Sequence, residues 1–124
     1  MPHRIFIVED HEWVREMLAR LLALQTDLEV CGAAEDPEAA LDALPAGADV
    51  VLVDLALGSH SGLDLVGAIR ERWPHIHCIV LSGKPAVEHA AAARDAGAAA
   101  FVEKGDAVSL LATLSDVLDL PKGP

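Results

Sequence analysis

Five short apolar runs recur along the chain, separated by longer segments of mixed polarity. They cover residues 5–8, 28–34, 50–53, 76–81 and 98–102. All except 28–34 are almost continuously apolar and do not alternate with polar residues. Continuous runs of this length are typical of strands that are covered on both faces, as in a parallel sheet. The runs therefore predict five buried parallel strands.

The segments between these runs have the periodicity of amphipathic helices. The first has apolar residues at the i, i+3, i+4, i+7 and i+8 positions of one buried stripe, namely Val14, Met17, Leu18, Leu21 and Leu22. Asp36 is a predicted N-cap with proline at the first helical position, and Asp106 is a predicted N-cap of the last helix. Two further helices are predicted at 63–73 and 87–96. Each apolar run is thus followed by one helix.

Strict alternation of strand and helix predicts an α/β fold. Such a chain forms a parallel sheet with helices on both faces and right-handed crossover connections. The 124 residues are enough for one domain. We predict a single domain over residues 1–120, with residues 121–124 as a tail or the start of a linker.

Composition and charge restrict the classes of function. Apolar residues make up 52% of the chain and aromatic residues only 3%, so we expect an aliphatic core. Nine basic against twenty acidic side chains give a net charge of −11, which disfavours direct binding of nucleic acid or of a membrane surface. The first apolar run is too short for a signal peptide, and no stretch is long enough to span a bilayer. We therefore expect a cytoplasmic protein.

Polar side chains collect at the predicted carboxyl ends of the strands, where parallel α/β sheets bind ligands. These residues are Glu9, Asp10, Asp54, Ser82 and Lys104. Three clustered carboxylates repel one another, and a hard cation such as Mg²⁺ relieves that repulsion. Asp54 can then act as an oxygen nucleophile that forms an acyl phosphate. Mg²⁺, Lys104 and Ser82 would each neutralise or bind one phosphoryl oxygen.

Four segments carry a family resemblance: Ile-Val-Glu-Asp-His, Val-Leu-Val-Asp-Leu, Ile-Val-Leu-Ser-Gly and Phe-Val-Glu-Lys-Gly-Asp. In this order and spacing the chain resembles a bacterial two-component response-regulator receiver domain. It is most similar to the NarL/FixJ-like subgroup, whose members often carry a C-terminal helix-turn-helix output domain. The resemblance implies a flavodoxin-like (βα)5 three-layer sandwich with strand order 2-1-3-4-5. It also implies that Asp54 accepts a phosphoryl group from the phosphohistidine of a sensor histidine kinase.

The resemblance also assigns a role to individual residues. Glu9 and Asp10 match the acidic metal pair, Asp54 the acceptor, Ser82 the hydroxyl and Lys104 the lysine, while Ala56 would bind Mg²⁺ through its backbone carbonyl. Phe101 falls at the aromatic switch position, with a plain core aromatic as the alternative. Glu9 departs from the more usual aspartate.

The sequence is also compatible with functions other than phosphoryl acceptance. Aspartyl-phosphate phosphatases need a second acid two residues after the nucleophile, and residue 56 is alanine. We therefore expect a phosphoacceptor that catalyses only its own phosphorylation and dephosphorylation. A pseudo-receiver that works without phosphorylation, or the N-terminal part of a DNA-binding transcriptional regulator, are the alternatives. The six histidines are interpreted as surface or rim residues, with an effect of His11 or His60 on phosphotransfer as the alternative.

The expected partners follow from the same resemblance. They are a sensor histidine kinase or phosphotransfer protein, and either a downstream protein target or the chain's own output domain. A homodimer through the last two helices and the fifth strand is a further expectation.

Overall fold

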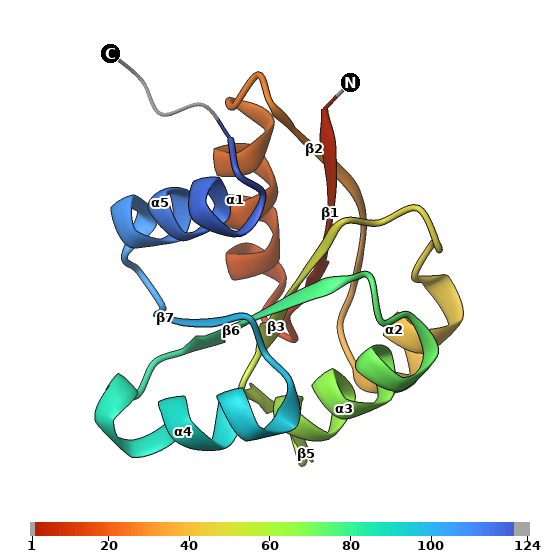
Figure 1. The fold of residues 1–124 in the computed structure, drawn as a ribbon, viewed down its shortest axis with the longest axis vertical. Helices are drawn as coiled ribbons and strands as arrows, with labels where there is room; N and C mark the ends of the chain where they lie inside the picture. The colour runs from red at the N-terminus through yellow and green to blue at the C-terminus, as the bar shows by residue number, and fades with distance from the viewer. Residues whose placement is uncertain (1, 121–124) are drawn as a thin grey trace.

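The structure, a computed structural model, describes residues 2–120 (Figure 1). The main strands are β1 (His3–Val8), β2 (Leu28–Ala34), β3 (Val50–Asp54), β6 (His77–Ser82) and β7 (Ala100–Glu103). The helices are α1 (Glu12–Ala23), α2 (Pro37–Ala43), α3 (Gly62–Arg72), α4 (Ala86–Ala96) and α5 (Ala107–Val117). The predicted tail at 121–124 lies outside the described residues.

The five main strands form one parallel sheet in the order β2-β1-β3-β6-β7. This confirms the predicted α/β class and the order 2-1-3-4-5. The chain first builds outward from β1 to β2, and then returns to place β3 on the other side of β1. The strand order therefore reverses between β1 and β3, which is the position where sheets of this type bind ligands.

Alternate residues of each central strand enter two separate cores. Ile5 and Ile7 pack with α1 and α5 on one side of the sheet, while Phe6 and Val8 pack with α2, α3 and α4 on the other side (Figure 1). Both faces of the central strands are thus buried, because side chains alternate across a strand. This is why these strands have continuous apolar runs in place of an alternating pattern.

The predicted N-caps form as expected. The Asp36 carboxylate accepts a hydrogen bond of 2.7 Å from the backbone N–H of Ala39, and Pro37 stands at the first helical turn. The Asp106 carboxylate accepts one of 3.0 Å from the backbone N–H of Ser109. These bonds satisfy N–H groups that have no partner inside the helix.

The fifth predicted strand begins two residues later than expected, at Ala100. Ala98 donates its backbone N–H to Ala93 O of α4, so it still belongs to the end of that helix. Ala98 and Ala99 are apolar and were therefore counted as strand. The apolar pattern alone does not distinguish a helix exit from a strand entry.

A small antiparallel hairpin that the sequence analysis did not predict follows β3. It consists of β4 (Ala56–Leu57) and β5 (His60–Ser61). The turn between them begins at Gly58, whose φ of 62° is in the region that favours glycine. Strands of two residues are too short for a periodic pattern, so the sequence carries no signal for them.

The same described part of the chain contains no helix that is both long and apolar enough to cross a bilayer.

Candidate functional site

The predicted site residues lie at the carboxyl ends of four neighbouring strands. Glu9 and Asp10 follow β1, and Asp54 and Ser82 are the last residues of β3 and β6. Lys104 follows the last residue of β7. The structure therefore brings the predicted residues to one edge of the sheet, next to the point where the strand order reverses.

Backbone hydrogen bonds extend the sheet beyond the strand ends and hold these residues in place. Glu9 N–H donates to Ala34 O at 3.0 Å, and Lys104 N–H donates to Ser82 O at 2.7 Å. Leu55 N–H, directly after Asp54, donates to Leu81 O at 2.8 Å. The candidate side chains thus project from a hydrogen-bonded sheet edge, which keeps their spacing fixed.

Lys104 forms ion pairs with two buried carboxylates. Its Nζ lies 2.8 Å from Asp54 Oδ2 and 3.1 Å from both carboxylate oxygens of Glu9, with the hydrogen bond to Glu9 made at Oε1. Glu9 is 1% exposed and Asp54 is 3% exposed. One ammonium group therefore faces two carboxylates, so the buried cluster carries excess negative charge.

The pKa values of the pair reflect this arrangement. Burial, and after it the neighbouring Glu9 carboxylate, raise the pKa of Asp54 to about 6, although the hydrogen bond from Lys104 lowers it. Burial lowers the pKa of Lys104, but the hydrogen bonds to Asp54 and Glu9 outweigh it and raise that pKa overall. Lys104 therefore stays protonated, while Asp54 ionises less readily than an exposed aspartate.

Two oxygens of the cluster lack hydrogen bonds in the part of the chain that the structure describes. They are Glu9 Oε2 and Asp10 Oδ1, and both are buried. One oxygen each from Glu9, Asp10 and Asp54 lies within 4.8 Å of the others. Buried carboxylate oxygens without donors are costly unless a cation or a proton compensates them. An oxygen-only ligand set of this kind fits Mg²⁺, which commonly keeps waters beside a few carboxylates. The acidic cluster is thus consistent with a magnesium site.

The hairpin and α3 shape the chain around Asp54. The backbone N–H of Ala56 donates to Asp54 Oδ1 at 3.2 Å, which places Ala56, the expected backbone metal ligand, beside the expected acceptor. Gly62 donates its N–H to Leu55 O at 2.7 Å, and a Cβ at this residue would lie 2.0 Å from the backbone oxygen of Asp54. Glycine is therefore required here by close backbone approach. The sequence analysis did not identify this role.

Ser82 ends β6, and Phe101, the residue at the expected aromatic switch position, lies in the neighbouring strand β7. Ser82 is 2% exposed, and its Oγ accepts a hydrogen bond of 2.9 Å from the backbone N–H of Lys84. It lines an open cavity of about 610 Å³ together with Asp54, Ala56 and Lys104. Phe101 is half-buried and packs against the core on the α2–α4 side of the sheet.

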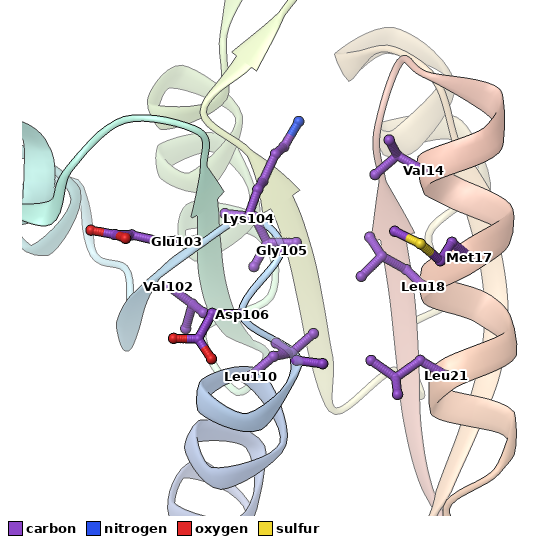
Figure 2. A pocket seen from close by; sticks show the side chains of 12 residues that line it. Val14, Met17, Leu18, Leu21, Val102, Glu103, Lys104, Gly105, Asp106 and Leu110 are labelled. Atoms are coloured by element: carbon purple, nitrogen blue, oxygen red, sulfur yellow. The ribbon is translucent and has the colours of Figure 1, made fainter.

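A second cavity, of about 300 Å³, lies on the other side of Lys104, between α1 and the start of α5 (Figure 2). Val14, Met17 and Leu18 of α1 face Leu110 of α5 across it. Its lining contains neither Asp54 nor the acidic pair, so it is not part of the candidate metal site. It is an apolar groove directly beside the loop that carries Lys104.

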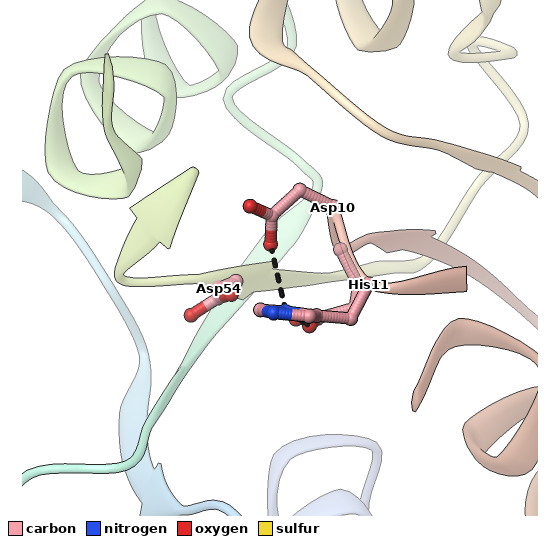
Figure 3. Close-up of side chains that lie close together, drawn as sticks. Asp10, His11 and Asp54 are labelled. Atoms are coloured by element: carbon pink, nitrogen blue, oxygen red, sulfur yellow. Dashed lines mark hydrogen bonds and ion pairs between the residues drawn. The ribbon is translucent and has the colours of Figure 1, made fainter. Parts of the chain in front are cut away.

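His11 lies closer to the acidic cluster than its interpretation as a rim residue implied. The residue is largely exposed, as expected, but its ring points toward the carboxylates (Figure 3). Its Nδ1 lies 3.2 Å from Glu9 Oε1 and 3.3 Å from Asp10 Oδ1. Arg15 was not identified from the sequence: its guanidinium donates to the backbone oxygen of Glu9 at 2.7 Å. For His11, its position directly after the acidic pair was the available signal.

The comparisons with known proteins agree with this geometry. The family model described as "Response regulator receiver domain" matches residues 5–115. The DNA-binding transcriptional activator DevR/DosR of Mycobacterium tuberculosis is 33% identical over 82% of this chain and 47% of its own length. The nitrate/nitrite response regulator protein NarP of Escherichia coli is 35% identical over 83% of this chain and 48% of its own length.

Solved structures show the same fold. A LuxR-family two-component response regulator from an Aurantimonas species superposes with a TM-score of 0.84 at 26% identity, covering 96% of this chain and 86% of that one. The receiver domain of AraT from Geobacillus stearothermophilus superposes with a TM-score of 0.81 at 29% identity, and the match covers 96% of this chain and 95% of that one. The chain spans about half the length of the curated relatives it matches. It belongs to the response regulator receiver domain family, the phosphoacceptor signalling modules of two-component systems.

Proposed function

We propose that Asp54 accepts a phosphoryl group from the phosphohistidine of a sensor histidine kinase, and that this modification changes the protein contacts of the domain. The observation that carries the proposal is the buried ion pair between Asp54 and Lys104 next to Glu9 and Asp10. A nucleophilic carboxylate, a fixed cation and a candidate magnesium site lie together at one sheet edge.

The residues of the chain have separate tasks in this transfer. An Asp54 carboxylate oxygen attacks the phosphorus, the bond from phosphorus to the donor nitrogen breaks, and the donor histidine keeps the electron pair. Lys104 pairs with the negative charge of the transferred group, and the Ser82 hydroxyl donates a hydrogen bond to it. Glu9 and Asp10, with Asp54 and the Ala56 carbonyl, would hold Mg²⁺. When bound, Mg²⁺ supplies positive charge that offsets repulsion between the carboxylates and the incoming phosphoryl oxygens.

The Asp54 carboxyl group can attack phosphorus only in its ionised form. The raised pKa of Asp54, about 6, leaves most of the carboxylate ionised at neutral pH. The Lys104 ammonium 2.8 Å away favours that ionised form. A phosphatase that hydrolyses external substrates is not supported, because Ala56 offers no side chain that can activate water.

Intact-mass measurement after incubation with acetyl phosphate tests this proposal. The expected result is one added phosphoryl group that requires Mg²⁺ and is absent in Asp54→Asn. Asp64→Asn is the matched control, because Asp64 is an exposed aspartate in the first turn of α3. A folded wild-type protein that gains no phosphoryl group would favour the pseudo-receiver alternative.

Two surfaces support contacts with partners. The apolar groove between α1 and α5 lies beside the loop of Lys104, where a phosphodonor protein must approach Asp54. In addition, Val87 in the first turn of α4 and Val108 in the first turn of α5 are large apolar residues that are 94% and 81% exposed. We propose that a homodimer or a downstream target contacts these exposed residues of α4 and α5. The target is either a separate protein or an output domain of a longer DNA-binding regulator, as the length of the relatives suggests.

Sedimentation with and without phosphorylation tests the dimer. A mass increase on phosphorylation that Val108→Glu abolishes supports it, whereas a monomer in both states excludes it.

A further inference from the structure

His11 belongs to the acidic cluster by geometry. One of its ring nitrogens and one carboxylate oxygen each from Glu9, Asp10 and Asp54 all lie within 4.8 Å of one another. Ligands about 2.0–2.2 Å from a tetrahedral ion are separated by about 3.3–3.6 Å. The distances from Nδ1 to Glu9 Oε1, 3.2 Å, and to Asp10 Oδ1, 3.3 Å, are close to that separation. The four groups can therefore surround one small ion after minor adjustment.

An independent observation indicates that the cluster lacks a ligand. Glu9 is 1% exposed, yet its Oε2 accepts no hydrogen bond from the described residues, and Asp10 Oδ1 is also buried without a donor. Lys104 lies 3.1 Å from Glu9 Oε2 but makes its hydrogen bonds to Glu9 Oε1 and Asp54 Oδ2. Neither Asp10 nor His11 is held by this lysine.

The local backbone leaves the imidazole free for this role. His11 is the N-cap residue of α1, but its side chain makes no capping hydrogen bond. The ring instead turns toward Asp10 and Asp54, as Figure 3 shows. No contact from the helix would have to be broken when Nδ1 binds a cation; Nδ1 would give up only its hydrogen bond of 3.2 Å with Glu9 Oε1, an oxygen of the same cluster.

We propose that His11 Nδ1 is a metal ligand, which makes this site a mixed nitrogen and oxygen site for first-row transition ions such as Co²⁺ and Zn²⁺. The inference rests on the metal site of the proposed function but adds a ligand to it. Mg²⁺ prefers oxygen ligands, whereas imidazole favours later transition ions, whose affinities also rise from Mn²⁺ toward Cu²⁺. His11 thus changes which ions compete for the site.

Calorimetric titration of the metal-free protein with Co²⁺ and with Mg²⁺ at one fixed pH tests the inference. We expect His11→Gln to lower the ratio of Co²⁺ affinity to Mg²⁺ affinity at least tenfold. The matched control is His60→Gln, since His60 is an exposed residue of β5 outside the cluster, and it should leave the ratio unchanged. The inference would be overturned if His11→Gln had the same affinity ratio as the wild type. This would be the case if neither affinity changed, or if both fell by the same factor.

Nitrogen-detected NMR of the histidine rings gives a second readout. Addition of Zn²⁺ to the wild-type protein should shift Nδ1 of His11 more than any ring nitrogen of His60, and an unshifted His11 would contradict the inference. Phosphorylation by acetyl phosphate with Mg²⁺ is measured separately on the wild type. If the wild type is phosphorylated but His11→Gln leaves the affinity ratio unchanged, only the assignment of His11 as a metal ligand is refuted. If His11→Gln lowers the affinity ratio but the wild type is not phosphorylated, only the proposed function is refuted.

Discussion

The ammonium nitrogen of Lys104 lies 2.8 Å from Asp54 Oδ2, although the two residues are 50 positions apart in the sequence. The same nitrogen lies 3.1 Å from the carboxylate of Glu9. The Lys104 side chain therefore connects the ends of β1, β3 and β7 through its ion pairs with Glu9 and Asp54. It neutralises part of the negative charge of a buried acidic cluster that would otherwise destabilise the fold.

Replacement of Lys104 should therefore destabilise the domain. In Lys104→Ala two buried carboxylates lose their shared cation, and we expect the free energy of unfolding to fall by about 2 kcal/mol at pH 7.5 without metal. Urea denaturation measures the change. Lys84→Ala is the control, since Lys84 is exposed in the same region and should change stability by less than about 0.5 kcal/mol. Equal stability of Lys104→Ala and wild type would show that the ion pair contributes nothing.

Asp54→Asn should have the opposite effect on stability. The pKa of Asp54 is raised from its ordinary value of 3.8 to about 6, so ionisation of this carboxyl disfavours the folded state. Below the pKa of the unfolded state, 3.8, this penalty is absent. It grows as the pH rises toward the pKa of the folded state, about 6, and at higher pH it is fully present. The variant should thus be about 1–3 kcal/mol more stable than wild type at pH 7.5 without metal, given about 1.36 kcal/mol per pKa unit.

Urea denaturation of both proteins at several pH values checks this prediction. The difference in unfolding free energy should shrink toward zero as the pH falls to 4. A difference that is constant with pH would mean that Asp54 ionisation is not its cause. Mg²⁺ should stabilise wild type more than Asp54→Asn, because the variant has lost a charged ligand.

Gly62→Ala should damage both stability and phosphorylation. The added Cβ would lie 2.0 Å from the backbone oxygen of Asp54, so the chain around the acceptor has to move. We expect a loss of at least about 2 kcal/mol in unfolding free energy, together with slower phosphorylation. Gly67→Ala in the same helix is the control: nothing lies within 4 Å of its added Cβ, and alanine favours helix, so a gain of about 0.5–1 kcal/mol is expected. A Gly62→Ala protein as stable and as active as Gly67→Ala would contradict the close approach.

Ser82 and Phe101 should respond together to phosphorylation. We expect the Ser82 hydroxyl to leave the Lys84 N–H and donate to the phosphoryl group, which allows Phe101 and α4 to rearrange. NMR should show chemical-shift changes at Phe101 and along Ala86–Ala96 on phosphorylation of wild type. Ser82→Ala should still be phosphorylated, but with smaller changes at these residues. If the chemical shifts of these residues do not change when the wild-type protein is phosphorylated, the switch is excluded.

The fold was predictable from the sequence because each of its signals is local. Continuous apolar runs follow from burial of Ile5, Phe6 and their neighbours on alternate faces, and the caps Asp36 and Asp106 mark helix starts directly. The family motifs added the strand order. The β4–β5 hairpin was missed because two-residue strands carry no periodic signal.

The residues of the site were predictable in part, for a related reason. Their positions at the predicted strand ends are enough to place Asp54 and Lys104 at one edge of the sheet. The orientation of a side chain is not encoded in that spacing, so the turn of the His11 ring toward Asp10 was not foreseen. The role of Gly62 depends on the distance between two backbone segments, which no local pattern reports.

The most direct test of the central claim is chemical identification of the phosphorylated residue. Borohydride reduces an aspartyl phosphate to homoserine, so peptide mass spectrometry after phosphorylation and reduction locates the acceptor. The account predicts homoserine at residue 54, formed only in samples that contained Mg²⁺. Homoserine at another aspartate, or a phosphoryl group that resists reduction because it is carried by a histidine, would contradict it.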